Sequence, residues 1–296
     1  MRDLFRDRPN GYIDSIKRGQ AVMSYLNGQM VYGEGSIQER TEKLVAAMDA
    51  ADAVIIGAGA GLSAAGGLNY ASPEFTEQCF PQYAALGYKN IMQILGTYWQ
   101  VNEANALKYY AVWAQHIHNI RYAPKATIPY LWLKEQVKDK DYFVITTNVD
   151  HQFHKAGFDS QRIFAMQGDY GLFQCATPCS DDLYDNKEWI ETTLAAMPDP
   201  FHIRPEDIPH CPHCGNYLVP NLRMDGSFVE RPHLNNAAAY KAFLQKCYSE
   251  PVLLLEYGVG FNTPTLIRYP FEQLARQFPD TVTLIRINTH NPEVPN

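Results

Sequence analysis

Four cysteines in the second half of the chain have the spacing of a metal site. Three residues separate Cys175 from Cys179, two separate Cys211 from Cys214, and 31 residues lie between the two pairs. Each pair can form a chelating turn, and two such turns supply the four thiolates of a tetrahedral zinc site. Four thiolates leave no open position for a substrate, so the expected zinc ion stabilises the fold and does not react.

Other interpretations of these cysteines stay open. The first pair has one more intervening residue than the commoner spacing, which leaves reduced surface thiols or a redox pair as alternatives. His213 lies between the last two cysteines. Because four cysteines already complete the set, we expect His213 to lie beside the metal without binding it.

A glycine-rich segment, GAGAGLSAAGGL at residues 57–68, follows an apolar run that could form a buried strand. Glycines let the backbone approach a pyrophosphate closely, and the free N–H groups of a following helix attract the phosphates. The candidates for nucleotide binding are Gly59, Ala60, Gly61 and Ser63. The alternative is a tight strand-to-helix turn that only packs closely.

The acidic residue of a conventional dinucleotide-binding oxidoreductase has no clear counterpart here. That residue ends a second strand about 20 residues after the glycines and binds the ribose. Glu74 and Glu77 are near this place, but they lie in a loop-like stretch with no strand pattern before it. The sequence therefore argues against ordinary hydride transfer.

Apolar runs and helical patterns alternate along the chain and must position these residues. The expected strands are residues 53–56, 142–146, 162–166, 252–256 and 282–287. The expected helices are residues 37–51, 130–138 and 265–277. Ser36 and Glu39 form a capping-box pair at the start of the first helix. This alternation predicts an α/β fold, namely a Rossmann-like, doubly wound parallel sheet with helices on both faces.

Two segments interrupt the alternation and predict a smaller, discontinuous domain. Residues 70–127 are aromatic and form its helical module, and residues 171–250 hold the paired cysteines of its zinc module. We expect the ligand cleft to lie between this domain and the sheet. The larger domain then consists of residues 36–69, 128–170 and 251–296. Residues 1–35 are expected to be an N-terminal extension, and its role stays open.

Composition and charge exclude several classes of function. Hydrophobic residues make up 46% of the 296 residues and charged residues 19%, which is typical of a folded globular protein. The net charge of -7 and the lack of basic runs with aromatic residues argue against nucleic acid as a partner. Neither a signal peptide nor a run of roughly 20 apolar residues is present. We therefore expect a cytoplasmic protein with no membrane partner.

Several short segments together resemble the sirtuin family. Residues 59–63 resemble its GAGxS motif, and residues 146–150, reading TTNVD, resemble its TQNxD segment. The other matching segments are Gly67-Leu68 for GI, Ala156-Gly157 for AG, Gln167-Gly168 for His-Gly, the cysteine pairs, Gly258-Val259-Gly260 for GTS, and Ile287-Asn288 for IN. Each motif is weak alone, but together they follow the order of the family over residues 53–290.

The resemblance implies NAD bound between a Rossmann-like domain and a zinc-bearing small domain, and cleavage of the nicotinamide–ribose bond. The residues it adds to the glycine-rich turn as NAD contacts are Asn148, Asp150, Gln167, Gly258, Gly260 and Asn288. Asn148 and Asp150 lie just past the end of a strand, where open parallel sheets bind ligands. A cap or turn is the alternative for these two residues, and a turn before THNPEVP is the alternative for Asn288.

The chain departs from the sirtuin pattern at several residues. The most consequential is Gln167, because deacylating sirtuins have there a histidine that acts as general base on a ribose hydroxyl. A carboxamide does not take up a proton near pH 7, so Gln167 can only hydrogen-bond and orient. Residues 69–72, reading NYAS, replace the family's PDFR and lack its arginine, and Gln152 and Phe153 replace Leu and His of NVDxLH.

These substitutions resemble the microbial macrodomain-linked class of sirtuins, which act as protein mono-ADP-ribosyltransferases. We expect NAD cleavage to be kept, with Asn148, Asp150 and Gln167 as catalytic residues, because it depends mainly on positioning and electrostatic stabilisation. Efficient deacylation should be lost. The resemblance also implies a lipoylated glycine-cleavage-H-like protein as acceptor and a macrodomain hydrolase as functional partner.

Two other functions stay open. An NAD-dependent deacylase would need another base, and His151 and His154 lie nearby in the sequence. A module that senses NAD or ADP-ribose would bind without turnover. Because Asn148 and Asp150 are both retained, the sequence favours an enzyme over a sensor.

Overall fold

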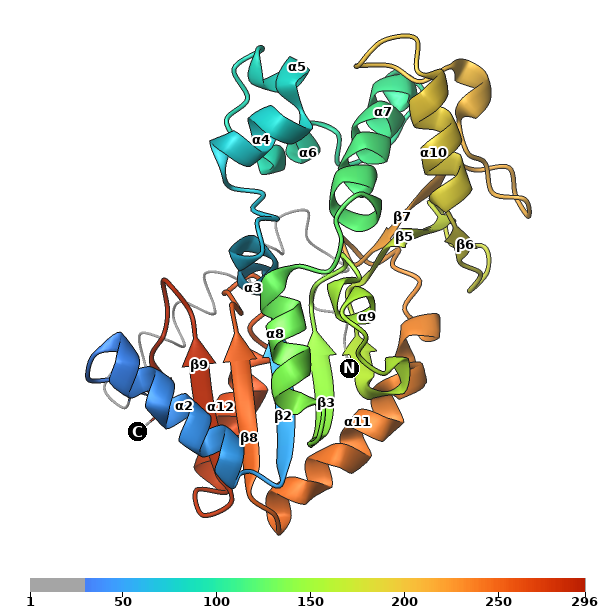
Figure 1. Cartoon of the computed structure of the whole chain (residues 1–296). Helices are drawn as coiled ribbons and strands as arrows, with labels where there is room; N and C mark the ends of the chain where they lie inside the picture. Colours follow the sequence, from blue (N-terminus) through green and yellow to red (C-terminus); the bar gives the residue numbers. More distant parts are fainter. Residues whose placement is uncertain (1–29, 296) are drawn as a thin grey trace.

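Five parallel strands form the largest sheet of the protein, in the order β4-β3-β2-β8-β9 (Figure 1). The computed structural model describes residues 30–295, so most of the predicted N-terminal extension lies outside the described residues. The strands are β2 (Ala53–Ala58), β3 (Asp141–Thr146), β4 (Ile163–Ala165), β8 (Val252–Tyr257) and β9 (Val282–Ile287). Every neighbouring pair is parallel. The predicted doubly wound sheet is confirmed, with all five strands on the expected apolar runs.

Helices cover both faces of this sheet because successive residues of each strand face opposite cores (Figure 1). Val54 and Ile56 belong to one core, and Ala53 and Ile55 belong to the other. The covering helices are α2 (Ile37–Ala50) and α8 (Ile128–Val137) on the first face and α11 (Ala237–Phe243) and α12 (Arg268–Gln277) on the second. None of the helices within residues 30–295 is long and apolar enough to span a membrane.

The strand order creates a ligand-binding position at one edge of the sheet. From β2 the chain moves outward through β3 to β4, and it later returns to β8 on the other side of β2. Open parallel sheets bind ligands at the carboxyl ends of the strands where the order reverses. The first residues beyond this edge after β2, β3 and β8 are Gly59, Thr147 and Gly258.

The second part of the fold lies beyond the carboxyl edge of the large sheet (Figure 1). Its sheet is antiparallel, with the order β6-β5-β7 for β6 (Tyr184–Asp185), β5 (Gly168–Cys175) and β7 (Leu218–Leu222). Its helices are α4 (Pro73–Cys79), α5 (Pro81–Ala84), α6 (Ile91–Thr97), α7 (Ala106–Ile117) and α10 (Lys187–Ala196). One aromatic-rich core joins these helices to the small sheet, which confirms a smaller helical and cysteine-bearing part beside the large sheet.

The segment after β7 returns to the large sheet. Residues 231–248 form η5 (Arg231–Asn236), α11 and η6 (Leu244–Tyr248). The rings of Tyr240 and Phe243 pack at a tilt against Phe143 of β3, with ring centroids 5.6 and 5.5 Å from that of Phe143. This part of the 171–250 segment therefore packs against the second face of the large sheet.

Caps set where two of the helices begin. Ser36 and Glu39 form the predicted capping box of α2, with both reciprocal hydrogen bonds present. The stretch around Glu74 is helix α4, so the loop expected there was wrong. Ser72 accepts a hydrogen bond from the Phe75 amide at 3.1 Å, and Pro73 opens the helix. Proline is favourable at the first helical position. The Ser72 cap and Pro73 therefore start a helix here although the sequence lacks apolar periodicity.

Candidate active site

The glycine-rich turn packs its backbone against the loop that follows β8. Helix α3 (Ala60–Ala65) begins right after Gly59, and the Gly61 amide donates to the Gly258 carbonyl at 3.0 Å. A Cβ on Gly61 would lie 2.7 Å from the Gly258 Cα, and one on Gly258 would lie 2.5 Å from Gly61. Gly258 also has a φ of 63°. Both positions therefore require glycine, whereas a Cβ on Gly260 would meet no atom within 4 Å.

Four polar side chains meet where β2 and β3 end. The Asn148 amide donates to the Gly59 carbonyl and to the Tyr130 hydroxyl, each at 2.9 Å. The Ser63 hydroxyl donates to the Asp150 carboxylate and shares a hydrogen bond with the Tyr130 hydroxyl at 2.7 Å. The structure thus brings the predicted residues Ser63, Asn148 and Asp150 together, and Tyr130 from α8 joins them.

Asp150 is the one acidic member of this cluster and is 3% exposed. Burial raises the pKa of Asp150, while the Ser63 hydroxyl and the Gln152 amide, which both donate to the carboxylate, lower it. Burial and the nearby charge of Asp150 raise the pKa of Tyr130, which stays a neutral phenol at pH 7. A carboxylate has about four acceptor positions, so Asp150 keeps acceptor capacity for a ligand N–H group.

Gln167 connects the two parts of the fold at the same edge. It lies between β4 and β5, and its backbone carbonyl accepts from the Arg223 amide at 3.0 Å. Gly168 follows with a φ of 101° and pairs with Leu222 of β7. The side-chain Nε2 of Gln167 is buried and has no hydrogen-bond partner within the described residues. Gln167 therefore holds an unused donor at the carboxyl edge of the sheet.

Asn288 begins the loop after β9 and uses its side chain within that loop. Its Nδ2 donates to the Val259 carbonyl at 2.9 Å, and its Oδ1 accepts from the His290 amide at 3.0 Å. The Asn288 side chain thereby holds the loops after β8 and β9 together. These contacts agree with the turn that the sequence left open, and a contact between Asn288 and a nucleotide stays a prediction.

The four paired cysteines converge at one end of the small sheet. Their Sγ atoms all lie within 4.8 Å of one another, and Cys175–Cys214 and Cys179–Cys211 are each separated by 3.5 Å. Zinc–sulfur bonds of about 2.3 Å place tetrahedral sulfurs about 3.8 Å apart, so this donor set fits a structural zinc ion. His213 instead pairs with Asp182 at 2.8 Å, outside the cysteine cluster.

Known structures with the same fold are Sir2 enzymes. A Sir2 homologue solved as a complex with NAD has a TM-score of 0.52 and 15% identity, over 88% of this chain and 85% of that chain. A structure solved for the mechanism and regulation of Sir2 enzymes has a TM-score of 0.51 and 16% identity, over 86% and 90% of the two chains. At this identity the likeness shows the fold alone.

Two curated relatives are similar in sequence over most of the chain, although no family model matches it. A protein ADP-ribosyltransferase of Staphylococcus aureus is 33% identical over 265 residues, which cover 87% of this chain and 81% of that protein. The chain belongs to the sirtuin-type protein ADP-ribosyltransferases. A probable bifunctional ADP-ribose hydrolase/ADP-ribosyltransferase of Fusarium oxysporum f. sp. cubense is 30% identical over 250 residues, which cover 81% of this chain and 41% of that protein.

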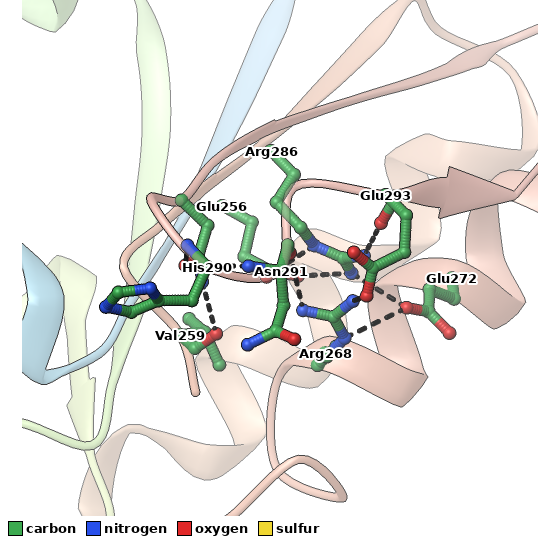
Figure 2. Close-up of polar contacts among 9 residues, drawn as sticks. Glu256, Val259, Arg268, Glu272, Arg286, His290, Asn291 and Glu293 are labelled. Carbon is green, nitrogen blue, oxygen red and sulfur yellow. Dashed lines mark hydrogen bonds and ion pairs between the residues drawn. The ribbon is translucent and has the colours of Figure 1, made fainter. Parts of the chain in front are cut away.

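A buried ion cluster fixes the C-terminal loop of this sirtuin (Figure 2). Arg286 binds Glu256 with N–O distances of 2.7 and 2.9 Å and reaches Glu272 at 2.9 Å. Arg268 binds Glu293 at 2.5 Å and donates to the Asn291 carbonyl. All five charged side chains are at most 7% exposed. The cluster therefore ties the loop that begins at Asn288 to β8, β9 and α12.

A second ion cluster joins three chain segments between the two parts of the sirtuin. Arg121 Nε and His151 Nδ1 each donate to the Asp169 carboxylate at 2.8 Å. Burial acts to raise the pKa of Asp169, but the His151 hydrogen bond and the Arg121 charge lower it to about 2. Asp169 is therefore a carboxylate, and His151 Nδ1 carries a proton. Arg121 lies in η2 (His118–Tyr122), which a short connection joins to α8.

His151 and His154, the alternative bases, belong to this second cluster. His151 has a φ of 64°, which is the only positive φ of a non-glycine residue between residues 30 and 295. The His154 ring stacks on the His151 ring at 3.9 Å, and burial lowers the pKa of His154 to about 4. Gln152 and Phe153 are buried, with Gln152 accepting from the Thr127 amide at 2.9 Å.

Sequence reasoning missed Tyr130, although it expected a helix there. No motif distinguishes this tyrosine from its neighbours in the helical pattern. Its position in the cluster arises because α8 packs beside α3, which brings its hydroxyl to Ser63 and Asn148. The charged ends of β8 and β9 were a weak signal for the buried ion cluster, because Glu256 and Arg286 interrupt otherwise apolar strands.

Proposed function

We propose that this sirtuin cleaves the nicotinamide–ribose bond of NAD and transfers ADP-ribose to a protein acceptor without deacylating acyl-lysine. The observation that carries the proposal is the buried, unpaired Nε2 of Gln167. A buried donor without a partner costs about 1–3 kcal/mol. A ribose hydroxyl of bound NAD would accept from Gln167 and remove this cost.

The surrounding residues fit NAD along its length. Gly59 precedes α3, and Ala60 and Gly61 open it at the carboxyl edge of the sheet, where residues without large side chains let a pyrophosphate approach the backbone closely. Ser63, Asn148 and Asp150 lie beside them. The candidates for the adenosine end are Gly258, Gly260 and Asn288 in the loops after β8 and β9.

The residues of this site can orient a reaction but do not supply a base at Gln167. When bound, NAD supplies an electrophilic ribose carbon and nicotinamide as its leaving group. Asn148 and Gln167 offer amide groups that hydrogen-bond without changing protonation near pH 7. Asp150 supplies a buried negative charge near the reacting end, where its field is little screened by water. This set supports cleavage and transfer, and it lacks the proton acceptor that deacylation needs.

The acceptor that we propose is a lipoylated carrier protein resembling the glycine-cleavage H protein, with a macrodomain hydrolase as the functional partner. The acceptor rests on the resemblance to macrodomain-linked sirtuins. The Fusarium relative supports the partner, because its name combines an ADP-ribose hydrolase and an ADP-ribosyltransferase in one protein.

Labelled NAD tests the proposal. The purified protein is incubated with lipoylated carrier, unlipoylated carrier or acetylated peptide, and label on protein and O-acetyl-ADP-ribose are measured separately. We expect label on the lipoylated carrier and no O-acetyl-ADP-ribose. Gln167→Ala should lower the transfer, whereas Gln38→Ala on the exposed face of α2 should not. No labelled carrier at saturating NAD, or rapid deacylation by the unaltered protein, would contradict the proposal.

A further inference from the structure

Strand β5 is irregular directly after Asp169. Asp169 and Phe173 both pair with β7, but residues 170–172 between them are left out of this ladder. The Asp169 carboxylate closes the resulting bulge, because its Oδ1 accepts from the Gly171 amide at 2.6 Å. Bulges beside active sites re-aim side chains and end strand pairing. Here the bulge begins two residues after Gln167.

The Arg121 guanidinium packs into this bulge and binds the same carboxylate. Arg121 Nε donates to Asp169 Oδ1 at 2.8 Å. A Cβ on Gly171 would lie 2.9 Å from Arg121 Nη2 and 3.0 Å from Asp169 Oδ1, so the ion pair leaves no room for a side chain there. The Arg121 carbonyl accepts from Lys155, the last residue of α9 (Gln152–Lys155). Asp169 thereby ties β5 to the connection between the two parts of the fold.

The third partner of Asp169 is His151, which forms a strained turn beside Asp150. His151 Nδ1 donates to Asp169 Oδ2 at 2.8 Å, and the His151 backbone has a φ of 64°. This left-handed conformation is costly for a residue other than glycine and persists only where its surroundings enforce it. The turn brings the Gln152 amide back to the Asp150 carboxylate, to which it donates at 3.1 Å. The hydrogen bond between His151 and Asp169 therefore helps to fix the orientation of Asp150.

The candidate catalytic groups lie on either side of this cluster. Gln167 lies two residues before Asp169, and Asp150 lies directly before its histidine partner. A backbone hydrogen bond of 3.0 Å from the Tyr170 amide to the Val149 carbonyl joins the same two segments. Side-chain and backbone contacts therefore cross-link the segment that carries Gln167 to the segment that carries Asp150.

We infer that Asp169 is a positioning residue, which holds Gln167 and Asp150 at the separation that NAD cleavage requires. Three hydrogen bonds from protein groups already occupy its carboxylate, which leaves little acceptor capacity for a ligand. Asp169 therefore acts through His151 and through the bulge of β5 without touching the ribose or the nicotinamide. The inference rests on the proposed NAD-cleaving function and adds the residue that fixes the geometry of its site.

Nicotinamide release from NAD, measured with and without the lipoylated carrier, tests the inference. Asp169→Ala removes all three contacts and should lower kcat about 10- to 100-fold, because small misplacements of reacting groups are costly. KM for NAD should change less than about twofold, since the contacts that bind NAD remain. Asp169→Asn should keep more of kcat than Asp169→Ala, because its carboxamide still accepts from Arg121 and can donate to an unprotonated His151 Nδ1.

A second pair of variants alters the histidine. His151→Gly relieves the backbone strain but removes the hydrogen bond, so it should lower kcat in the same way with Asp169 intact. Asparagine tolerates the left-handed conformation and places an N–H donor where histidine has Nδ1, so His151→Asn should keep more of kcat than His151→Gly. A general base at position 151 would instead be lost equally in both variants. Asp199→Ala is the matched control, because Asp199 binds His202 at the surface, and it should behave like the unaltered protein.

A spectroscopic measurement reports the position of Gln167 without turnover. In protein with isotope-labelled glutamine side chains, the amide resonance that is absent from Gln167→Ala belongs to this residue. ADP-ribose should shift this resonance in the unaltered protein. Asp169→Ala and His151→Gly should bind ADP-ribose with unchanged affinity but without the same shift. The histidine variant keeps the test open if Asp169→Ala does not fold.

Three results would overturn the inference. They are unchanged kcat in Asp169→Ala and His151→Gly, equal losses in His151→Asn and His151→Gly, and a Gln167 resonance that responds to ADP-ribose alike in all proteins. Failure of the proposed function gives a different pattern. The unaltered protein would then release no nicotinamide and label no acceptor. If ADP-ribose still shifts the Gln167 resonance only where the cluster is intact, the placement of Gln167 by Asp169 stands.

Discussion

Arg286 and Glu256 stand side by side on neighbouring parallel strands and form a two-pronged ion pair with both side chains fully buried. The pair lies directly before the two loops that carry Gly258 and Asn288. Burial raises the pKa of Glu256, against the opposing effect of the Arg286 charge. The ion pair, together with the contacts of Arg268 and Glu293, therefore holds these two loops in place (Figure 2).

Removing one partner of this pair should destabilise the protein strongly. We expect Arg286→Met to lower the free energy of unfolding by about 3–5 kcal/mol, because it leaves a buried carboxylate without its cation. Urea denaturation at pH 7 measures the change. Arg231→Met is the matched control, since Arg231 pairs with Asp181 at the surface and should change stability by about 0–1 kcal/mol. Equal effects of the two substitutions would show that the buried cluster is unimportant for stability.

A histidine at position 167 should supply the missing base. We expect Gln167→His to raise O-acetyl-ADP-ribose formation from acetylated peptide at least about 10-fold above the unaltered protein, because general-base catalysis is typically worth more than that. The gain should rise with pH through the histidine pKa, since only neutral imidazole accepts a proton. Mass spectrometry of the products gives the measurement. An unaltered protein that already deacylates as fast as the variant would disprove the assigned role of Gln167.

The close approach of two loops should make one glycine essential and another dispensable for stability. Gly258→Ala places a methyl group 2.5 Å from the Gly61 backbone at a φ of 63°. We expect a loss of about 1–3 kcal/mol in the free energy of unfolding, as for other overpacked sites. Gly260→Ala, whose methyl group meets no atom within 4 Å, should stay within about 0.5 kcal/mol. Thermal and urea unfolding of both variants compare the two positions, and similar losses would contradict the packing argument.

The ion cluster at Asp169 should contribute stability that depends on pH. The pKa of the Asp169 carboxyl group in the folded protein is about 2, which lies below the value of about 3.9 for an unfolded aspartate. The contribution is therefore complete above the unfolded value and is lost as the pH falls through the folded value. We expect the stability difference between the unaltered protein and Asp169→Asn to be constant from pH 7 to about 5 and to shrink below about pH 4. A stability difference between the two proteins that grows as the pH falls would contradict the lowered pKa of Asp169.

The sequence determined the elements and most of the candidate site. Continuous apolar runs such as residues 252–256 predicted buried parallel strands, because both faces of such strands meet helices. Ordered short motifs predicted that Ser63, Asn148 and Asp150 lie together, since the carboxyl ends of parallel strands share one edge. The spacing of Cys175, Cys179, Cys211 and Cys214 predicted their convergence, because each pair spans a single turn.

Only the tertiary structure decided which other side chains join these residues. Tyr130 comes from α8 and meets Ser63 and Asn148 from two other segments, and no local pattern connects residues that meet only after three elements pack. The same holds for Arg268 and Glu293, whose charges are buried together because the C-terminal loop folds back onto α12. Backbone periodicity encodes which elements form, whereas polar contacts between distant segments depend on how those elements pack.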